Sequence, residues 1–443
     1  KPFGPRARPR GRPRGRPFER AGRRSPAATP IGAPAAFSGS PSSMGMRSPI
    51  GLCQEDAEEA AAPAPLTGIC LAEVMSSLAA QVQPWRPGGF AMVRAIQGAP
   101  RNHGKVDEMR HEGKLVAVKR MPNWWVMETH EEFEYKYPKE VERPWHDLGI
   151  AAALRQRGFA HTCELIGIFR DDSLTYTVSE LATHGDLFSW SIQAPAPGRA
   201  RELAVRAVAS QLCAAVRQMH DLGVAHCDLS LENVLLIGAP GGRAGGFQLK
   251  VIDFAMAKIG RLQAAAPKNQ TGKKFYAAPE LHAAAAPGRP ESAVVDAFLA
   301  DAFALGVLLY ALALADYPWS STQKGESNNF EYARRFGADK FLERRSLRGA
   351  LLTTLLSKGL LQLLGGLMRS EPEQRLTVGE ACYPEERASV WGLTYLDDTG
   401  ARAAARACQA GDQQVQKTLS TGSVSTTMSE GACAASDSEP EGS

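Results

Sequence analysis

Residues 226–233 read H-C-D-L-S-L-E-N, and Asp253-Phe254-Ala255 follows them farther along the chain. Asp228 and Asn233 come just before one apolar run, and Asp253 ends another; both runs predict short strands. We therefore expect two carboxylates and one amide to meet at two strand ends. Such oxygen groups suit Mg²⁺, and one carboxylate remains to orient an attacking hydroxyl. The pattern predicts magnesium-assisted phosphoryl transfer from ATP.

Composition limits the folded part of the chain to its middle. The 443 residues are 44% hydrophobic and 22% charged, which is typical of a soluble protein with a large core. Arg, Pro, Ala, Gly and Ser dominate the N-terminal end, and Ser, Thr, Gly and acidic residues dominate the C-terminal end. We expect disordered tails around about 300 folded residues, which is enough for one unit of two lobes.

Cysteine usage and hydropathy bear on the compartment. The eight cysteines form no C-x-x-C pair, which disfavours a disulfide framework or a zinc site and favours a reducing compartment. The longest apolar run, Ala302 to Ala315, has about fourteen residues, so we expect a buried helix and no transmembrane segment. We expect a cytoplasmic or nuclear protein. Because the chain begins at Lys1 rather than at methionine, an upstream targeting signal stays an open alternative.

The N-terminal end is strongly basic. Nine arginines lie between Arg6 and Arg24, against the single acid Glu19, and they alternate with Pro and Gly. This pattern prevents a helix and predicts a flexible cationic arm. A nucleic acid, such as RNA, or another acidic partner fits such an arm, and so does a solvated tail without a dedicated partner.

Strand patterns fill the first part of the folded region and helical patterns fill the second. The predicted strands cover residues 90–96, 115–119, 163–169 and 174–179. Helical patterns cover residues 69–82, 145–157 and 200–222, with Gly223 as the C-cap of the last.

At the stretches quoted first, the chain resembles the eukaryotic protein kinases, whose catalytic loop reads H-R-D-L-x-x-x-N and whose metal loop reads D-F-G. The resemblance is to divergent serine/threonine-type kinases of single-celled eukaryotes. It implies an α+β, bilobal fold, with a small lobe built on a five-stranded antiparallel sheet and one helix, and a larger, mainly α-helical lobe. We expect an arm with a short helix over residues 1–87, the small lobe over 88–180, the large lobe over 181–388 and a mostly disordered tail over 389–443.

The resemblance also implies the catalytic roles. Asp228 is implied to orient the substrate hydroxyl, while Asn233 and Asp253 hold Mg²⁺ on the phosphates of ATP. Residues 116–119 read V-A-V-K and match the strand V-A-I-K, so Lys119 is implied to contact the α- and β-phosphates. The helix that follows offers Asp147 as the acid that pairs with Lys119, and Glu142 is the alternative.

Further motifs place the nucleotide and hold the large lobe together. In the glycine loop G-x-G-x-x-G-x-V, Gly104 fits the last glycine and Gly98 fits the first with one inserted residue, while Arg101 stands in place of the middle glycine. The residues implied to contact ATP are Gly98, Gly104, Val106, Ala117, Lys119, Ser179, Glu180, Ala182, Asp186 and Leu235. The residues implied to be structural are Asp147, Glu280 of the A-P-E motif, its ion-pair partner Arg375, and Asp301, which ties down the catalytic loop.

Four departures from the family pattern carry consequences. Cys227 replaces the arginine that reads a phosphorylated activation segment, so we expect activity without control by segment phosphorylation. Ala255 replaces the glycine of D-F-G and should make the metal loop less able to flip. Ser230 stands where a lysine is expected and Lys273 where a threonine is expected, which makes Lys273 a candidate catalytic cation.

Together these features predict a Mg²⁺-dependent kinase that transfers the γ-phosphoryl group of ATP to a protein substrate. Serine or threonine is the expected acceptor, because D-L-S-L-E-N lacks the A-A-R pattern of tyrosine kinases. One alternative is a pseudokinase scaffold with weak or no ATP turnover, which the incomplete glycine loop, Asp147 and Ala255 favour. Another is a kinase that the basic arm tethers to RNA. The substrate and the oligomeric state stay open.

Overall fold

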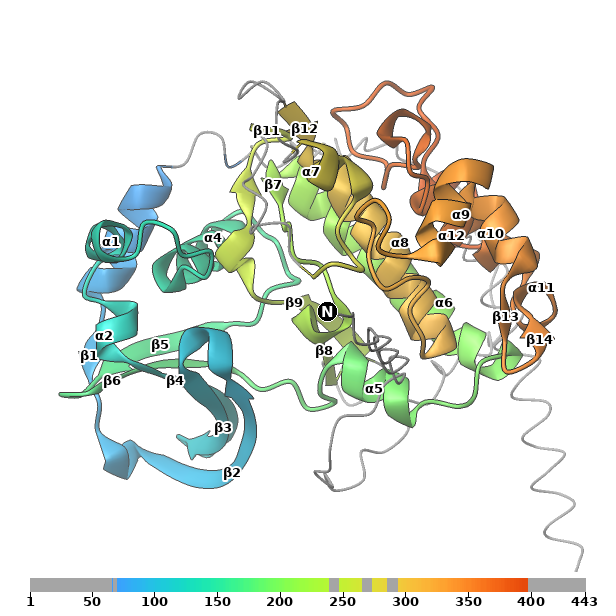
Figure 1. The fold of residues 1–443 in the computed structure, drawn as a ribbon. Coiled ribbons are helices and arrows are strands. Elements are labelled where there is room, and N and C mark those ends of the chain that lie inside the picture. The colour runs from blue at the N-terminus through green and yellow to red at the C-terminus, as the bar shows by residue number, and fades with distance from the viewer. Residues whose placement is uncertain (1–65, 67–69, 239–246, 265–272, 285–293, 397–443) are drawn as a thin grey trace, which may run out of the picture.

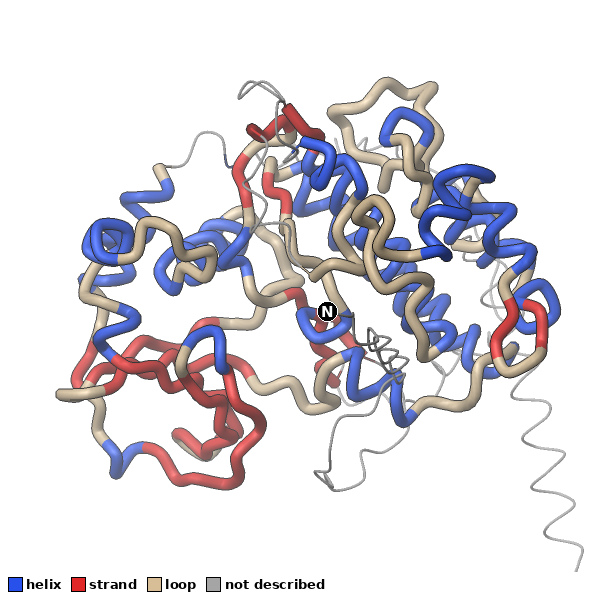
Figure 2. Tube along the Cα trace, viewed as in Figure 1, coloured by secondary structure: helices blue, strands red, loops and turns tan. Residues whose placement is uncertain are grey.

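Two lobes joined by an extended connector after β6 make up the computed structural model, which describes residues 66, 70–238, 247–264, 273–284 and 294–396 (Figure 1). Strands are concentrated in one lobe and helices in the other (Figure 2). The expected α+β, bilobal architecture is therefore confirmed. The basic arm, Thr271 and the Ser-rich tail lie outside the described residues.

A six-stranded sheet in the order β1-β5-β6-β4-β3-β2 forms the frame of the small lobe. Neighbours from β2 to β6 are antiparallel, as expected for five strands, and the short β1 adds a sixth strand parallel to β5. Trp85 fixes this addition, because its ring stacks on Tyr176 at 3.9 Å. The strands are β1 (Gln83–Pro84), β2 (Phe90–Ala99), β3 (Gly104–His111), β4 (Lys114–Pro122), β5 (Leu165–Arg170) and β6 (Leu174–Glu180).

The strand β3 escaped the sequence pattern because two of its buried residues are acids. Asp107 pairs with Arg120 at 2.6 Å, and Glu108 pairs with Arg94 at 2.7 Å. Each arginine supplies the charge that lets an acid occupy a buried position. The alternation of apolar and polar residues that predicts a strand is therefore absent from the sequence of β3.

The small lobe holds more helices than the single one expected. They are α1 (Leu71–Ala80), α2 (Asn123–Val126), α3 (His130–Lys136) and α4 (Pro144–Gln156). The insert between β4 and α4 forms α2 and α3, and its Trp125 and Phe133 share a buried cluster with Met75 of α1 and Trp145 of α4. Because α1 packs on α4, the small lobe begins before residue 88, and the segment expected to be arm contributes to its core.

Helix α1 approaches α4 closely at Gly149. A Cβ at that position would lie 2.6 Å from Cγ of Met75, so a larger residue would force the Met75 side chain to move. This contact positions α4, the helix that carries Asp147.

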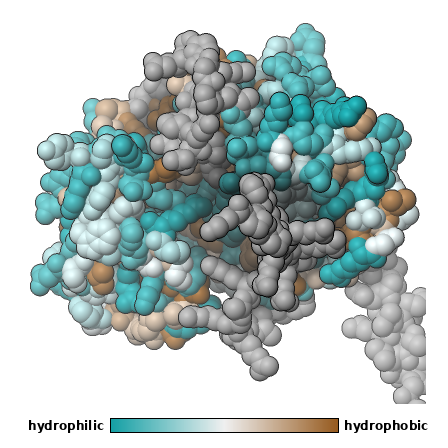
Figure 3. Space-filling model, viewed as in Figure 1, coloured by the Kyte–Doolittle hydropathy of each residue, from teal (hydrophilic) through white to brown (hydrophobic). Residues whose placement is uncertain are grey.

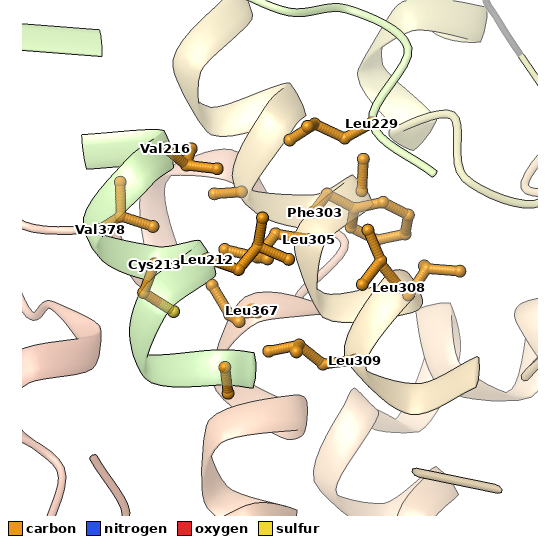
Figure 4. Packing of buried hydrophobic residues seen from close by; sticks show 14 of the residues in the cluster. Leu212, Cys213, Val216, Leu229, Phe303, Leu305, Leu308, Leu309, Leu367 and Val378 are labelled. Carbon is orange, nitrogen blue, oxygen red and sulfur yellow. The ribbon is translucent and has the colours of Figure 1, made fainter. Parts of the chain in front are cut away.

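Two long helices form the centre of the large lobe. Figure 4 shows Leu212 of α6 packed near Leu305 of α8, with Leu367 of α12 beside them. All 18 residues of α8 are buried. The helices are α5 (Leu187–Gln193), α6 (Arg199–Asp221), α7 (Pro279–Ala284), α8 (Ala297–Leu314), α9 (Asn328–Phe336), α10 (Ala338–Arg344), α11 (Leu352–Leu355) and α12 (Lys358–Leu367).

Helix α8 is longer than the apolar run suggested. Its 18 residues are sufficient in length and hydropathy to cross a membrane, so the length argument made from the sequence was wrong. Complete burial against the other helices shows that α8 is a core helix of this fold.

In the view of Figure 3 the outer surface is mainly hydrophilic, with scattered apolar patches.

Short strands complete the large lobe and shape its loops. They pair as β7 with β10, β8 with β9, β11 with β12 and β13 with β14. Their bounds are β7 (Val224–Ala225), β8 (Val234–Gly238), β9 (Phe247–Val251), β10 (Lys258–Ile259), β11 (Leu262–Ala264), β12 (Val294–Asp296), β13 (Ser346–Leu347) and β14 (Ala350–Leu351). Val390 and Tyr395 are buried, so the large lobe continues past residue 388.

The ion pair between Glu280 and Arg375 is present. Two nitrogens of the Arg375 guanidinium meet the two carboxylate oxygens of Glu280 at 2.6 and 3.0 Å. Arg375 is fully buried and also donates to the carbonyl of Leu299. The pair therefore joins α7 to the start of α8 and to the turn after α12.

Candidate active site

The catalytic loop between β7 and β8 is held by one carboxylate. Asp301 of α8 accepts hydrogen bonds from the backbone amides of His226 at 2.6 Å and Cys227 at 2.9 Å. Cys227 has φ +63°, a left-handed conformation that non-glycine residues adopt at a cost. The two bonds to Asp301 hold this conformation and turn the next residue, Asp228, toward the cleft.

A buried histidine supports Asp301 from behind. His220 at the end of α6 lies 3.1 Å from Asp301 through Nε2 and 2.7 Å from Glu380 through Nδ1. Burial opposes a charge on the ring, but the bonds to Asp301 and Glu380 prevail and raise the pKa of His220 to about 9. At neutral pH an imidazolium therefore lies between the two carboxylates.

Asp228, Asn233 and Asp253 are brought together by the hairpin of β8 and β9. Nδ2 of Asn233 donates to the backbone carbonyl of Asp228 at 2.9 Å and lies 3.3 Å from its Oδ2. The amide of Ile252 donates to the carbonyl of Asn233 at 3.0 Å, so Asp253 directly follows this contact. The three residues that the sequence singled out first thus lie at one place in the cleft.

Asp228 is suited to accept a proton. Burial raises the pKa of its carboxyl above the ordinary value, while Lys273, His226 and Arg101 oppose this shift. Only 4% of its side chain is exposed. A carboxylate whose pKa is raised by burial is a better base than one in water.

The question of which acid meets Lys119 has a geometric answer. Nζ of Lys119 lies 3.8 Å from Oδ2 of Asp147, and Oδ1 of Asp147 accepts the amide of Phe254 at 2.8 Å. Burial raises the pKa of Asp147, and Lys119 opposes the shift. Glu142 is engaged elsewhere, by Arg101 at 3.0 Å. Asp147 therefore links the lysine of β4 to the metal loop.

Strand register places the expected nucleotide residues around one face of the sheet. Val106 pairs with Lys119, and Ala117 pairs with Ser179. A Cβ added at Gly98 would meet open space. At Gly104 it would collide with the carbonyl oxygen of Arg120, so this glycine is required for strand packing irrespective of phosphate contact.

The connector residues have structural partners as well. Glu180 pairs with Val116 in the sheet, and its carboxylate lies 3.6 Å from Nζ of Lys250. Ala182 follows in the connector itself, and its carbonyl accepts the amide of Gly185.

The start of α5 meets the strand that follows the catalytic loop. Asp186 caps α5 through a 2.6 Å bond from the amide of Ser189, and it forms an isolated bridge with Leu235. These contacts fix the cleft floor, while the expected contacts of these residues with adenine and ribose stay predictions.

Lys273 meets Ser230 as the exchange of residue types suggested. Its Nζ lies 2.6 Å from Oγ of Ser230 and 3.0 Å from Oε2 of Glu232. Its charge is also the largest influence that opposes the raised pKa of Asp228. The structure therefore brings this cation to the catalytic loop.

At position 227 the family has a charged arginine, whereas this chain has an uncharged cysteine. Burial raises the pKa of the Cys227 thiol well above its ordinary value, so the group is neutral. A cavity of about 110 Å³ adjoins it, lined by apolar residues such as Ala255 and Leu281 together with Arg143, Lys258 and Lys273. Arg143 is paired with Glu134 at 2.6 Å.

The donor set fits Mg²⁺. Asp253 and Asn233 supply carboxylate and amide oxygens, which are hard ligands, and Nδ2 of Asn233 faces Asp228, which leaves Oδ1 for a cation. Within the described residues no three acids, histidines or cysteines cluster closely enough to enclose a metal.

Three residues of the site, His220, Glu380 and Arg101, were not assigned roles from the sequence, and Glu142 was considered only as an alternative partner of Lys119. His220 and Glu380 belong to separate helical and loop segments, and no linear motif joins them. Arg101 and Glu142 were noted, but not their contact with each other. Arg101 was visible as a departure at a glycine position, which was the one available signal.

Comparisons with known proteins show the family to which the chain belongs. The family model described as protein kinase domain matches residues 102–385. A CBL-interacting protein kinase 22 from Oryza sativa subsp. japonica is 30% identical over 54% of this chain and 47% of its own length. A serine/threonine-protein kinase SAPK3 from Oryza sativa subsp. indica is 30% identical over 52% of this chain and 60% of its own length.

This chain covers a larger share of a mammalian relative. The testis-specific serine/threonine-protein kinase 3 of Mus musculus is 34% identical over 48% of this chain and 68% of its own length. The chain spans about half to two thirds of the length of these three relatives. The matched family model covers well over half of the chain and contains Lys119, Asp228 and Asp253. The chain is therefore a member of the protein kinase domain family.

Proposed function

We propose that this chain is an active protein kinase that transfers the γ-phosphoryl group of ATP to serine or threonine hydroxyls of a protein substrate. The convergence of Asp228, Asn233 and Asp253, with Lys119 held by Asp147, carries the proposal. A cytoplasmic or nuclear setting goes with it as an expectation from the cysteine pattern.

The chemistry follows from the positions of these groups. The hydroxyl oxygen of the substrate attacks the γ-phosphorus, the bond to the bridging β–γ oxygen breaks, and ADP leaves. Asp228 orients the hydroxyl and receives its proton. Asn233 and Asp253 would hold Mg²⁺, which when bound would neutralise negative charge on the phosphates. Lys119 orients the α- and β-phosphates, and Asp147 keeps its ammonium in place.

Transfer of labelled γ-phosphate tests this function directly. The parent should phosphorylate itself or a mixed Ser/Thr peptide pool with Mg²⁺, and Asp228→Asn or Asp253→Asn should lower the rate by roughly 10²–10⁴-fold. Asp172→Asn, in an exposed turn, is the matched control and should keep the parental rate. Phosphoamino acid analysis identifies the acceptor.

A parent that binds Mg·ATP but gives the same counts as Asp228→Asn would contradict the proposal and leave a pseudokinase scaffold. Phosphotyrosine as the main product would contradict the assignment of the acceptor. Chelation by EDTA should abolish transfer, and added Mg²⁺ should restore it.

We propose that Lys273 supplies the positive charge that the family takes from a lysine two residues after the catalytic aspartate. Its contact with Ser230 places the ammonium beside the catalytic loop, and Glu232 holds it from the other side. Electrostatic stabilisation depends on where the charge lies and not on which segment carries it.

Lys273→Ala should therefore slow phosphoryl transfer by about 10–100-fold and change Mg·ATP affinity by less than about threefold, since the charge acts mainly in the transition state. Lys274→Ala, at an exposed lysine paired with Glu326, is the control and should match the parent. An unchanged rate in Lys273→Ala would remove the role. The double variant Ser230→Lys, Lys273→Thr should recover part of the lost rate.

We propose further that activity does not depend on phosphorylation of the activation segment. The neutral Cys227 supports this, because it cannot bind a phosphate as an arginine does. Thr271 is the one serine or threonine between Asp253 and Glu280.

Thr271→Ala should accordingly retain the parental transfer rate within about twofold, because position 227 has no guanidinium to bind a phosphate on Thr271. Phosphatase treatment of the parent should also leave the rate unchanged. A loss beyond about tenfold in both experiments would show that another cation, such as Lys258, reads the segment.

A further inference from the structure

Arg101 brings an additional cation to the catalytic aspartate. It lies in the 3-10 turn η3 (Pro100–Asn102) between β2 and β3, at the tip of the small-lobe hairpin. Its Nη1 lies 3.0 Å from Oε1 of Glu142 and 3.3 Å from Oδ2 of Asp228. The tip of the small lobe therefore reaches across the cleft to the catalytic loop of the large lobe.

The turn is held in this position by the insert. His103 ends η3 in the left-handed region with φ +52°, and its ring lies 4.8 Å from Trp124 and 4.7 Å from Trp125. Asn102, between Arg101 and His103, is buried. These contacts fix the tip, so Arg101 is presented to the cleft by an ordered turn.

Arg101 also changes how the tip can meet phosphate. Glycines at such a tip let backbone amides approach phosphate oxygens, whereas a side chain at this position keeps them apart. The guanidinium provides donors of its own and pairs with phosphate through two N–H groups at once. Arg101 therefore prevents phosphate from binding to the backbone amides of the tip and offers its guanidinium as the donor instead.

The position of the contact matches the path of the terminal phosphate. An acceptor hydroxyl held by Asp228 must lie about 3–3.5 Å from the γ-phosphorus before transfer. A guanidinium nitrogen 3.3 Å from Oδ2 of Asp228 therefore lies where a γ-phosphate oxygen has to come within reach. The α- and β-phosphates, which Lys119 is proposed to contact, lie farther from Asp228.

The guanidinium of Arg101 has N–H donors that are not used by its two acidic partners, and its side chain is half exposed. Among the described residues, both acidic contacts of Arg101 use Nη1, which leaves Nη2 and Nε without a carboxylate partner. The Arg101 side chain is 48% exposed, while that of Glu142 is 11% exposed. Glu142 can therefore act as the fixed member that orients Arg101 while Asp228 exchanges the guanidinium for the substrate hydroxyl.

We propose that Arg101 binds the γ-phosphate of ATP directly, oriented by Glu142, and so makes this site prefer ATP over ADP. The proposal rests on the proposed function only in that the cleft binds ATP. It assigns a phosphate-binding side chain to a position that the family gives to glycine. Phosphoryl transfer itself follows the steps already described.

Calorimetric titration of the full chain with Mg·ADP and with a non-hydrolysable Mg·ATP analogue tests this role. ADP lacks the γ-phosphate, so Arg101→Ala should weaken the analogue about tenfold while ADP affinity changes by less than about twofold. Arg101→Lys, which keeps the charge without the fork, should fall between. Arg110→Ala is the matched control, because the guanidinium of Arg110, on the same hairpin, donates to the backbone carbonyl of Gly113 and forms no ion pair with any acid among the described residues.

Glu142→Gln provides a second test that does not remove the cation. It should reduce the preference for the ATP analogue in the parent and have no further effect in Arg101→Ala, since the two residues act together. Equal losses for both nucleotides, or no loss, would overturn the proposal. So would tighter binding of both nucleotides and faster transfer in Arg101→Ala, which would show that the contact blocks the site.

These outcomes separate the proposal from the wider function. A parent that discriminates between the nucleotides through Arg101 but transfers no phosphate would keep this inference and remove the kinase activity. A parent that binds neither nucleotide would remove both.

Discussion

The buried carboxylate of Asp301 is the constraint on which the rest of the site depends. It holds the amides of His226 and Cys227, and through them it sets the left-handed turn that presents Asp228. His220 and Glu380 complete a buried charge cluster behind it. Since an unpaired buried charge costs several kcal/mol, about 3–5 in measured cases, each member of this cluster stabilises the other two.

The small lobe and the large lobe each bring positive charge to the same carboxylate. Lys273 approaches Asp228 from the activation segment, and Arg101 approaches it from the hairpin tip. The family pattern has neither residue type at these positions, yet the electrostatic requirement of phosphoryl transfer concerns position alone. The insert between β4 and α4 contributes to this arrangement, because its Trp124 and Trp125 contact His103 and so hold the hairpin tip that carries Arg101.

The sequence was sufficient for the two lobes, for Asp228, Asn233 and Asp253, and for the pair Glu280–Arg375, because short motifs encode the loops and strand ends that carry them. It left the partner of Lys119 open between Asp147 and Glu142, and the packing of α4 decides for Asp147. It was insufficient for β3, where buried acids hide the alternation, and for the helices of the insert, which are too short for a periodic pattern. Contacts such as Arg101–Asp228 and His220–Glu380 depend on how distant segments pack. Their partners lie 127 and 160 positions apart, so no local pattern reports them.

Asp301 controls catalysis by positioning the catalytic loop, and the variant Asp301→Asn probes this role. An asparagine offers one carbonyl oxygen, so one of the two loop amides loses its acceptor. We expect phosphoryl transfer to fall by about 100-fold while Mg·ATP affinity changes by less than about threefold. Glu380→Gln, which touches His220 but not the loop, should lower the melting temperature and keep the transfer rate. A folded Asp301→Asn protein that transfers phosphate at the parental rate would contradict the account.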